Sequence, residues 1–323
     1  MASRHLRIWL YRLLLLKSDK NGKGGFTLIE LLVAIIIAAL VVSGLLFLVV
    51  EMLQLDRREF VLNQTQQDIQ RAMAYISDDV QEAVYVYSTA TSVSSQITDG
   101  PANGIPVLAF WRPDPLPDSA VQRLNSGTSF CSTPSSREDE CNVLKLRQYT
   151  YSLVVYYLVP NNGTTLWEGP SRIVRYELPR YQNISSFTSM NDLNPTSGYD
   201  DPTFGGTSFR GWSATGTTAG QSPVLVDYID ASTATVANVQ DCNGLGANYT
   251  RSPADVNVTS FFVCAPDNLG ANGGNINQDI YLFLRGNALD GRDGLINSRN
   301  EEVDNPTLET RVQVRGVLDK RPE

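Results

Sequence analysis

The chain has 323 residues, a formal net charge of −8, four cysteines and a single histidine, His5. Residues 1–25 hold six basic residues and one acid, which leaves 20 basic and 33 acidic residues in the other 298. A segment this acidic is a poor partner for nucleic acid. If residues 1–25 are removed, no imidazole remains, which excludes Ser-His-Asp and Cys-His catalysis and histidine-ligated zinc. No nucleophile elbow, P-loop or dinucleotide fingerprint occurs either, so we expect no enzymatic activity.

The first predicted element is a membrane-spanning helix. The run from Leu31 to Val50 contains 20 uncharged residues, about the length that crosses the hydrocarbon core of a bilayer as a helix. Glu30 lies directly before it, and a carboxylate at such a place is a candidate functional residue. Basic residues precede the run, whereas residues 56–59 after it are neutral overall. The positive-inside rule therefore predicts a single-pass inner-membrane protein with a cytoplasmic N-terminus. Everything after Val50 is then periplasmic or extracellular.

Three interpretations compete for residues 1–50. A secretory signal peptide has a shorter apolar core, followed by a cleavage site between small residues, and neither feature is present. A plain membrane anchor fits the length but explains neither Glu30 nor the polar KSDKNGKGG before Phe26. The third interpretation is a resemblance: GGFTLIELLVAI is similar to the N-terminus of type IV prepilins and type II secretion pseudopilins. This resemblance covers Gly25 to about Val50.

The resemblance implies how the N-terminus is processed. Residues 1–25 would be a basic leader, cut off after Gly25 by a prepilin peptidase that also methylates the new N-terminal residue, Phe26. Glu30 would be the fifth mature residue, which acts in assembly with other pilin or pseudopilin subunits on an inner-membrane platform. The amine of a neighbour's Phe26 would then offset the desolvation of the Glu30 carboxylate. We expect this pair to fix the height of each subunit, as a buried polar residue fixes coiled-coil register.

The helical pattern continues beyond the apolar run. Apolar residues recur mostly every three or four positions over residues 62–87, which indicates an amphipathic helix. No proline lies between Phe26 and Gly100. We therefore expect one helix with a membrane and assembly half over residues 26–50 and an amphipathic half over residues 51–90. Many major pilins have a proline where this chain has Phe47, so its absence points away from a major subunit.

Residues 91–323 are predicted to form a β-rich domain outside the cytoplasm. Its predicted strands are rich in Val, Ile, Tyr and Phe and bounded by turn residues; they cover residues 105–111, 146–159, 172–179, 223–230, 259–264, 279–286 and 308–316. The fold class is thus α+β, with a long N-terminal helix packed on an antiparallel sheet, as in type IV pilins. We expect a proline-rich loop at residues 112–118. The aperiodic segment 185–222 is either a binding loop or a flexible insertion, and we favour the second.

The four cysteines are Cys131, Cys141, Cys242 and Cys264. An even number in an exported domain indicates disulfide bonds. Of the three possible pairings we favour the local one, Cys131–Cys141 with Cys242–Cys264, because short loops close most easily. Reduced, buried thiols are the alternative.

A calcium site is a further candidate. The segment 289–304 is dense in Asp, Asn, Glu and Gly, but an EF-hand register fails because it places Leu289 and Asn300 where acids are required. The oxygen ligands Asp290, Asp293, Asn297 and Glu301 would have to bind Ca²⁺ in another geometry. Turn chemistry on a solvated loop is the alternative. We expect no other cofactor.

Finer resemblances narrow the expected role. RAMAYISDDVQEAVYVY, and the two strands within VVYYLVPNNGTTLWEGPSRIVRYELP, resemble the larger minor subunits, similar to the J pseudopilin and the W minor pilin. LDRREF, DDVQEAVYVYS and IPVLAFW resemble the pseudopilins of hormogonium polysaccharide secretion in filamentous cyanobacteria. These resemblances imply a minor pilin or pseudopilin that supports polysaccharide secretion and gliding motility. The alternatives are a pilus-tip adhesin or glycan-binding subunit that uses residues 185–222, and an unrelated anchored enzyme.

Overall fold

The computed structural model divides the chain into two compact units, residues 1–57 and 58–323, and each is described by itself. The described residues are 25–127, 130–131, 137–162, 166–204, 208–231, 242–245, 249–266, 279–288 and 305–314.

The main helix, α2, runs from Leu28 to Gln81 and contributes to both units. Every residue of α2 in the first unit is exposed, whereas the second unit buries one face of the helix, including Ile69, Ile76 and Val80. The helix ends nine residues before the expected boundary at residue 90. It stops there because the alternating aromatic and β-branched residues that follow form strand β1 (Tyr85–Val86) beside β2.

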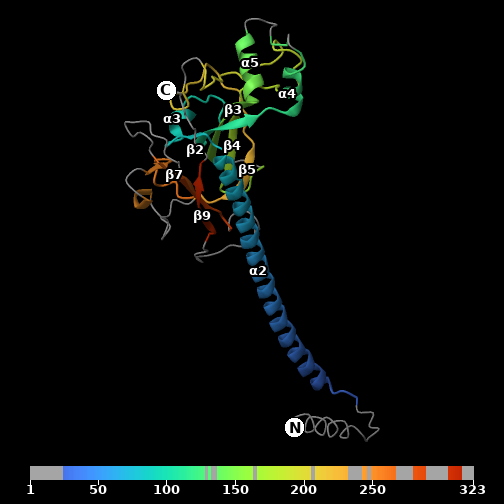
Figure 1. The fold of residues 1–323 in the computed structure, drawn as a ribbon. Coiled ribbons are helices and arrows are strands. Elements are labelled where there is room, and N and C mark those ends of the chain that lie inside the picture. Colours follow the sequence, from blue (N-terminus) through green and yellow to red (C-terminus); the bar gives the residue numbers. More distant parts are fainter. Residues whose placement is uncertain are drawn as a thin grey trace, which may run out of the picture. The chain divides into compact units, whose positions relative to one another are not determined.

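Two antiparallel sheets follow α2 in the sequence. Figure 1 draws their strands as arrows, coloured by their position in the sequence. The first has the order β1 (Tyr85–Val86), β2 (Ile105–Pro115), β3 (Tyr149–Pro160), β4 (Ser171–Leu178) and β5 (Val224–Ile229). The second has the order β6 (Tyr249–Ser252), β7 (Phe261–Pro266), β8 (Asp279–Arg285) and β9 (Thr307–Gln313). Short helices α3 (Thr91–Ser94), α4 (Asp118–Leu124), α5 (Glu138–Arg147) and the 3₁₀ helix η2 (Cys242–Leu245) lie between strands. The α+β class is confirmed, and the seven predicted strands are present with boundaries shifted by a few residues.

The proline-rich stretch is a strand rather than the expected loop. β2 continues to Pro115, and Pro113 and Pro115 pair with Tyr151 and Tyr149 of β3. The backbone N–H of Leu116 donates to the carbonyl of Gln148, so even-numbered residues here bond toward β3. The two prolines occupy the alternate positions, where a missing N–H removes no bond to β3.

The central core lies between α2 and the two sheets within the second unit. It joins the buried face of α2 to residues of both sheets, among them Phe110 and Tyr156 of the first and Phe261 and Leu282 of the second. One face of α2 and one face of each sheet thus bury one another, because a sheet must cover its apolar face with another element.

Gly286 sets how closely the second sheet approaches α2. A Cβ added at Gly286 would lie 2.7 Å from Cγ2 of Thr65 and 2.9 Å from Cγ2 of Ile69. We expect Gly286→Ala to lower the free energy of unfolding by about 1–3 kcal/mol, because overpacking a dense core forces its neighbours apart. Chemical denaturation followed by circular dichroism measures this. The control Gly127→Ala adds a methyl group where no atom lies within 4 Å, and a loss of equal size there would contradict the explanation.

Tyr199, Phe209 and Trp212 of the segment 185–222 pack on the other face of the first sheet. Trp212 is buried and its ring centroid lies 5.6 Å from that of Trp111 in β2, and the Tyr199 hydroxyl donates to the Tyr151 carbonyl at 2.7 Å. Farther along, Gly220 donates its backbone N–H to the Asp99 carboxylate at 2.6 Å. The flexible insertion stays a prediction. The segment gains its contacts through single anchoring side chains rather than through a repeating pattern.

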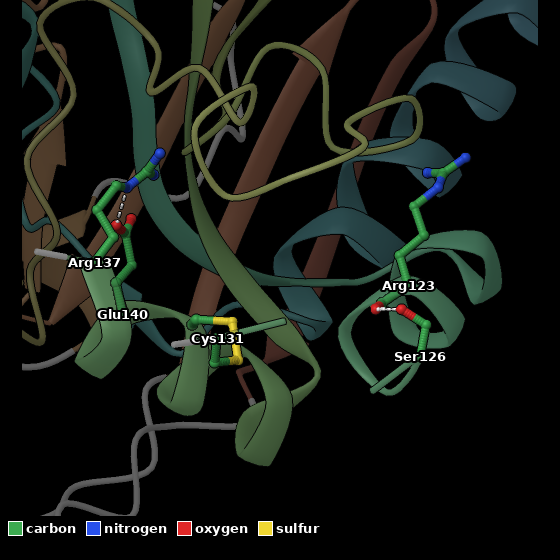
Figure 2. The surroundings of a disulfide bond; sticks show 6 residues. Arg123, Ser126, Cys131, Arg137 and Glu140 are labelled. Atoms are coloured by element: carbon green, nitrogen blue, oxygen red, sulfur yellow. Dashed lines mark hydrogen bonds and ion pairs between the residues drawn. A yellow bond between two sulfur atoms is a disulfide. The ribbon is translucent and has the colours of Figure 1, made fainter. Parts of the chain in front are cut away.

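The structure pairs the cysteines locally, Cys131 with Cys141 and Cys242 with Cys264. The first disulfide joins the start of α5 to the preceding chain (Figure 2). It belongs to a small peripheral cluster with residues of α4 and of the segment 185–222. Beside it, Arg137 donates to Glu140 at 2.7 Å. Burial opposes ionisation of Glu140, but the hydrogen bonds from Arg137 and Tyr181 outweigh it and hold the pKa of this carboxyl below its usual value.

Candidate functional site

The candidate processing and assembly residues lie at the start of α2. Thr27 directly precedes the helix, and its side-chain oxygen and carbonyl both accept the backbone N–H of Glu30, at 3.3 and 3.1 Å. The sequence Thr-Leu-Ile-Glu thus has the residues and spacing of a capping box. Glu30 also lies in the first turn, where a negative charge interacts favourably with the helix dipole. The local sequence therefore fixes where the helix begins and places Glu30 three residues inside it.

Glu30 is exposed in the single chain. Within the described residues, its carboxylate has neither a hydrogen-bond donor nor an ion-pair partner. The partner inferred from the sequence, the Phe26 amine of a neighbouring subunit, would belong to another chain.

Gly25 is not required for packing. A Cβ added there meets no atom within 4 Å, and Phe26, the next residue, is 81 % exposed. A glycine at this position therefore has no explanation in the fold of the described residues.

The first unit exposes a continuous apolar helix surface. Large apolar side chains from Leu28 to Leu55 are 46–84 % exposed. Among the described residues, α2 is the one helix that is long and apolar enough to cross a membrane, with a mean hydropathy of 3.2 over its most apolar window. So much exposed apolar surface is incompatible with water and requires lipid or other subunits around it.

Comparison with known families found a match at the N-terminus. Residues 20–46 match the prokaryotic N-terminal methylation motif. The match supports a type IV pilin or pseudopilin subunit. No curated protein and no solved structure matches the chain. This motif implies processing by a prepilin peptidase and assembly with other pilin subunits, and together with the apolar helix it suggests membrane anchoring.

The other predicted site residues are not part of this N-terminal site. The four cysteines form the two disulfides described above. The calcium candidates Asp290, Asp293, Asn297 and Glu301 lie outside the described residues, as do residues 1–24 of the leader. In the part of the chain that the structure describes, no group of three or more His, Cys, Asp or Glu side chains is placed to hold a metal ion.

The structure adds a buried charge cluster that the sequence analysis missed, here called the Asp79 cluster. Asp79 of α2 accepts hydrogen bonds from Arg112 of β2 at 2.9 Å, from Arg175 of β4 at 2.8 Å and from the Tyr156 hydroxyl of β3 at 2.7 Å. Glu177 completes it by accepting from Arg175 at 2.5 Å and from Arg112 at 3.2 Å. One carboxylate of the helix is therefore tied to three adjacent strands of the first sheet.

The surroundings of Arg175 and Tyr156 keep both side chains protonated. Burial would lower the pKa of Arg175, but its hydrogen bond with Asp79 and the charges of Asp79 and Glu177 outweigh burial and raise this pKa. Burial and the negative charge of Asp79 both raise the pKa of the Tyr156 hydroxyl, which keeps the hydroxyl protonated as a donor. The cluster is a structural joint between α2 and the sheet, with every named group held by a partner.

Proposed function

We propose that the chain is a minor pilin or pseudopilin, a structural and non-catalytic subunit of a type IV pilus-like or type II secretion-like filament. The observation that carries the proposal is the methylation motif at residues 20–46 on a helix with an exposed apolar surface. The minor role rests on the resemblance of residues 71–87 and 154–179 to the larger minor subunits. Support of polysaccharide secretion and gliding motility rests on the resemblance of LDRREF, DDVQEAVYVYS and IPVLAFW.

The proposed cellular setting follows from the charge asymmetry around the apolar run. The N-terminus would be cytoplasmic, residues 26–50 would cross the inner membrane, and residues 91–323 would lie in the periplasm or outside the cell. After processing, the subunit would pass from the membrane into the filament on an inner-membrane assembly platform. Disulfides in the second unit suit an oxidising compartment.

A pilus-tip adhesin that binds through residues 185–222 is supported less well. Of the aromatic side chains in this segment, Phe187 and Trp212 are buried, whereas Phe204 is 56 % exposed. Phe187 packs in the peripheral cluster beside the first disulfide and Trp212 packs on the first sheet, so neither ring is open to a ligand.

Processing at Gly25 tests the proposal. We expect Gly25→Val to leave residues 1–25 attached, because a branched side chain obstructs the peptidase while the fold has room for it. The measurement is the intact mass and N-terminal sequence of the protein purified from cells with its own peptidase. Gly44→Val is the matched control, because Gly44 also lies in open space. A mature N-terminus at Phe26 in the Gly25→Val protein would refute the processing assignment, and so would a wild-type protein that keeps its leader.

A further inference from the structure

We propose that the second unit carries a saccharide-binding groove between α2 and β5. The groove has a volume of about 540 Å³, within the usual range for small-molecule sites. Helix α2 lines it with Asp68, Arg71, Ala72 and Tyr75, which recur at the spacing of one helix face. The opposite lining comes from residues 166–168 and 225–228. Both linings belong to the unit formed by residues 58–323.

Three aromatic residues line this groove, Tyr75, Trp167 and Tyr228. Guanidinium groups stack on two of them at 6.0 Å from the ring centroid, Arg175 on Tyr75 and Arg172 on Trp167. Cation–π contacts of this kind hold a ring in place. The flat apolar faces of such rings complement the C–H faces of a pyranose, and their polar edges tolerate water.

The backbone directly after Trp167 is held against β5 by contacts within the unit itself. Asp227 accepts the backbone N–H groups of Glu168 and Gly169 at 3.1 and 3.2 Å, and the Asn161 amide at 2.7 Å. Gly169 lies so close to β5 that an added Cβ would be 2.5 Å from the Tyr228 backbone nitrogen. Asp227 is thus a positioning residue, and a groove fixed in this way loses little conformational entropy on binding.

The polar groups of the groove match a molecule rich in hydroxyl groups. Besides the positioning residue Asp227, its charged lining residues are Asp68, Arg71 and Glu168. Arg71 lies 3.8 Å from Asp68, and the Tyr228 hydroxyl donates to Glu168 at 3.0 Å, which leaves further lone pairs of the Glu168 carboxylate for a ligand. Carboxylates accept hydrogen bonds from hydroxyl groups, whereas they repel a uronic acid. We therefore infer an uncharged saccharide rather than an acidic one.

A polypeptide strand fits this groove less well. Strand addition needs a regular edge, and the pairing of β5 with β4 contains register shifts. The backbone at Tyr228 adds a positive φ of 58°. Both features bend a strand away from a further partner.

Titration calorimetry of the purified full-length protein tests the proposal, in a detergent without a sugar headgroup. The probes are neutral linear hexasaccharides of glucose and galactose, with hexagalacturonate as the acidic comparison. We expect saturable binding of a neutral hexasaccharide, weakened at least about tenfold in Trp167→Ala and Tyr75→Ala and retained in Trp167→Phe, which keeps a flat ring. Phe204→Ala, an exposed aromatic of residues 185–222, is the matched control, and melting curves verify that each variant is folded.

Several outcomes would overturn the proposal: no saturable binding of either neutral probe, stronger binding of hexagalacturonate, or equal affinities for the wild type and Trp167→Ala. Loss of binding in Phe204→Ala alone would assign the saccharide to residues 185–222 instead. Because binding is measured on the purified chain, failure here leaves filament assembly untouched, and failure of processing at Gly25 leaves the groove untouched.

Discussion

Replacing Glu30 with alanine is expected to leave a processed, membrane-inserted subunit that no longer assembles. In a filament, a carboxylate at this depth lies in a low-dielectric helix bundle, and its proposed partner is the Phe26 amine of a neighbour. Removing one member of such a pair leaves the other charge buried and uncompensated, at a cost of about 3–5 kcal/mol. Incorporation into sheared or crosslinked filaments should therefore fall by about a hundredfold or more, as measured by immunoblotting.

Two further variants separate charge from shape. Glu30→Gln keeps the size of the side chain without its charge, so it should fail as Glu30→Ala does. Ser43→Ala is the matched control, because this polar residue of the same helix bonds its hydroxyl only to the Leu40 carbonyl, at 3.0 Å, among the described residues. Normal assembly of Glu30→Ala or Glu30→Gln would show that the carboxylate has no role in placing the subunit.

Asp79→Ala is expected to be the most destabilising single change in the second unit. It removes one of the two carboxylates that Arg112 and Arg175 share, which leaves Glu177 as the carboxylate that both guanidinium groups still contact, and the side chain of Arg175 is only 7 % exposed. Breaking a buried pair in this way costs about 3–5 kcal/mol, a large share of the stability of a typical domain. Urea denaturation of the full-length protein in detergent, followed by tryptophan fluorescence, measures the loss.

The neighbouring carboxylate provides the control. Asp78 precedes Asp79 in α2 but is exposed, so Asp78→Ala should change stability by no more than about 0.5 kcal/mol. Equal effects of the two substitutions would mean that the Asp79 cluster does not hold the helix to the sheet.

The elements that were predictable are those with a repeating pattern. The apolar run and the recurrence of apolar residues every three or four positions predicted α2. Segments rich in β-branched and aromatic residues predicted the seven longer strands. Strand β1 has two residues and exists because the backbone of Val84 and Tyr87 bonds to β2, a contact that local sequence does not encode. The buried anchors of residues 185–222 likewise depend on distant partners such as Trp111 and Asp99.

The candidate site divides in the same way. Gly25, Phe26 and Glu30 belong to a short contiguous motif, so they were visible in the sequence. The sequence indicates the burial of Asp79 only through its spacing. It lies three residues after Ile76 and seven after Ala72, which places it on the buried face of α2. Its partners Arg112 and Arg175 are 33 and 96 residues away, and only the folded sheet brings them to it.

The positions of the two disulfides have a consequence for where the chain can fold. Both lie in peripheral clusters, Cys131–Cys141 beside α4 and α5, and Cys242–Cys264 beside Phe262 and Phe283 on the second sheet. The central cluster between α2 and the sheets contains no cysteine. The helix–sheet core therefore contains no residue that oxidation joins, and the two disulfides constrain the chain at the edges of this core. In a cell that delays disulfide formation, we expect the Asp79 cluster still to join α2 to the first sheet. We expect the chain next to the four cysteines to be easier for proteases to reach.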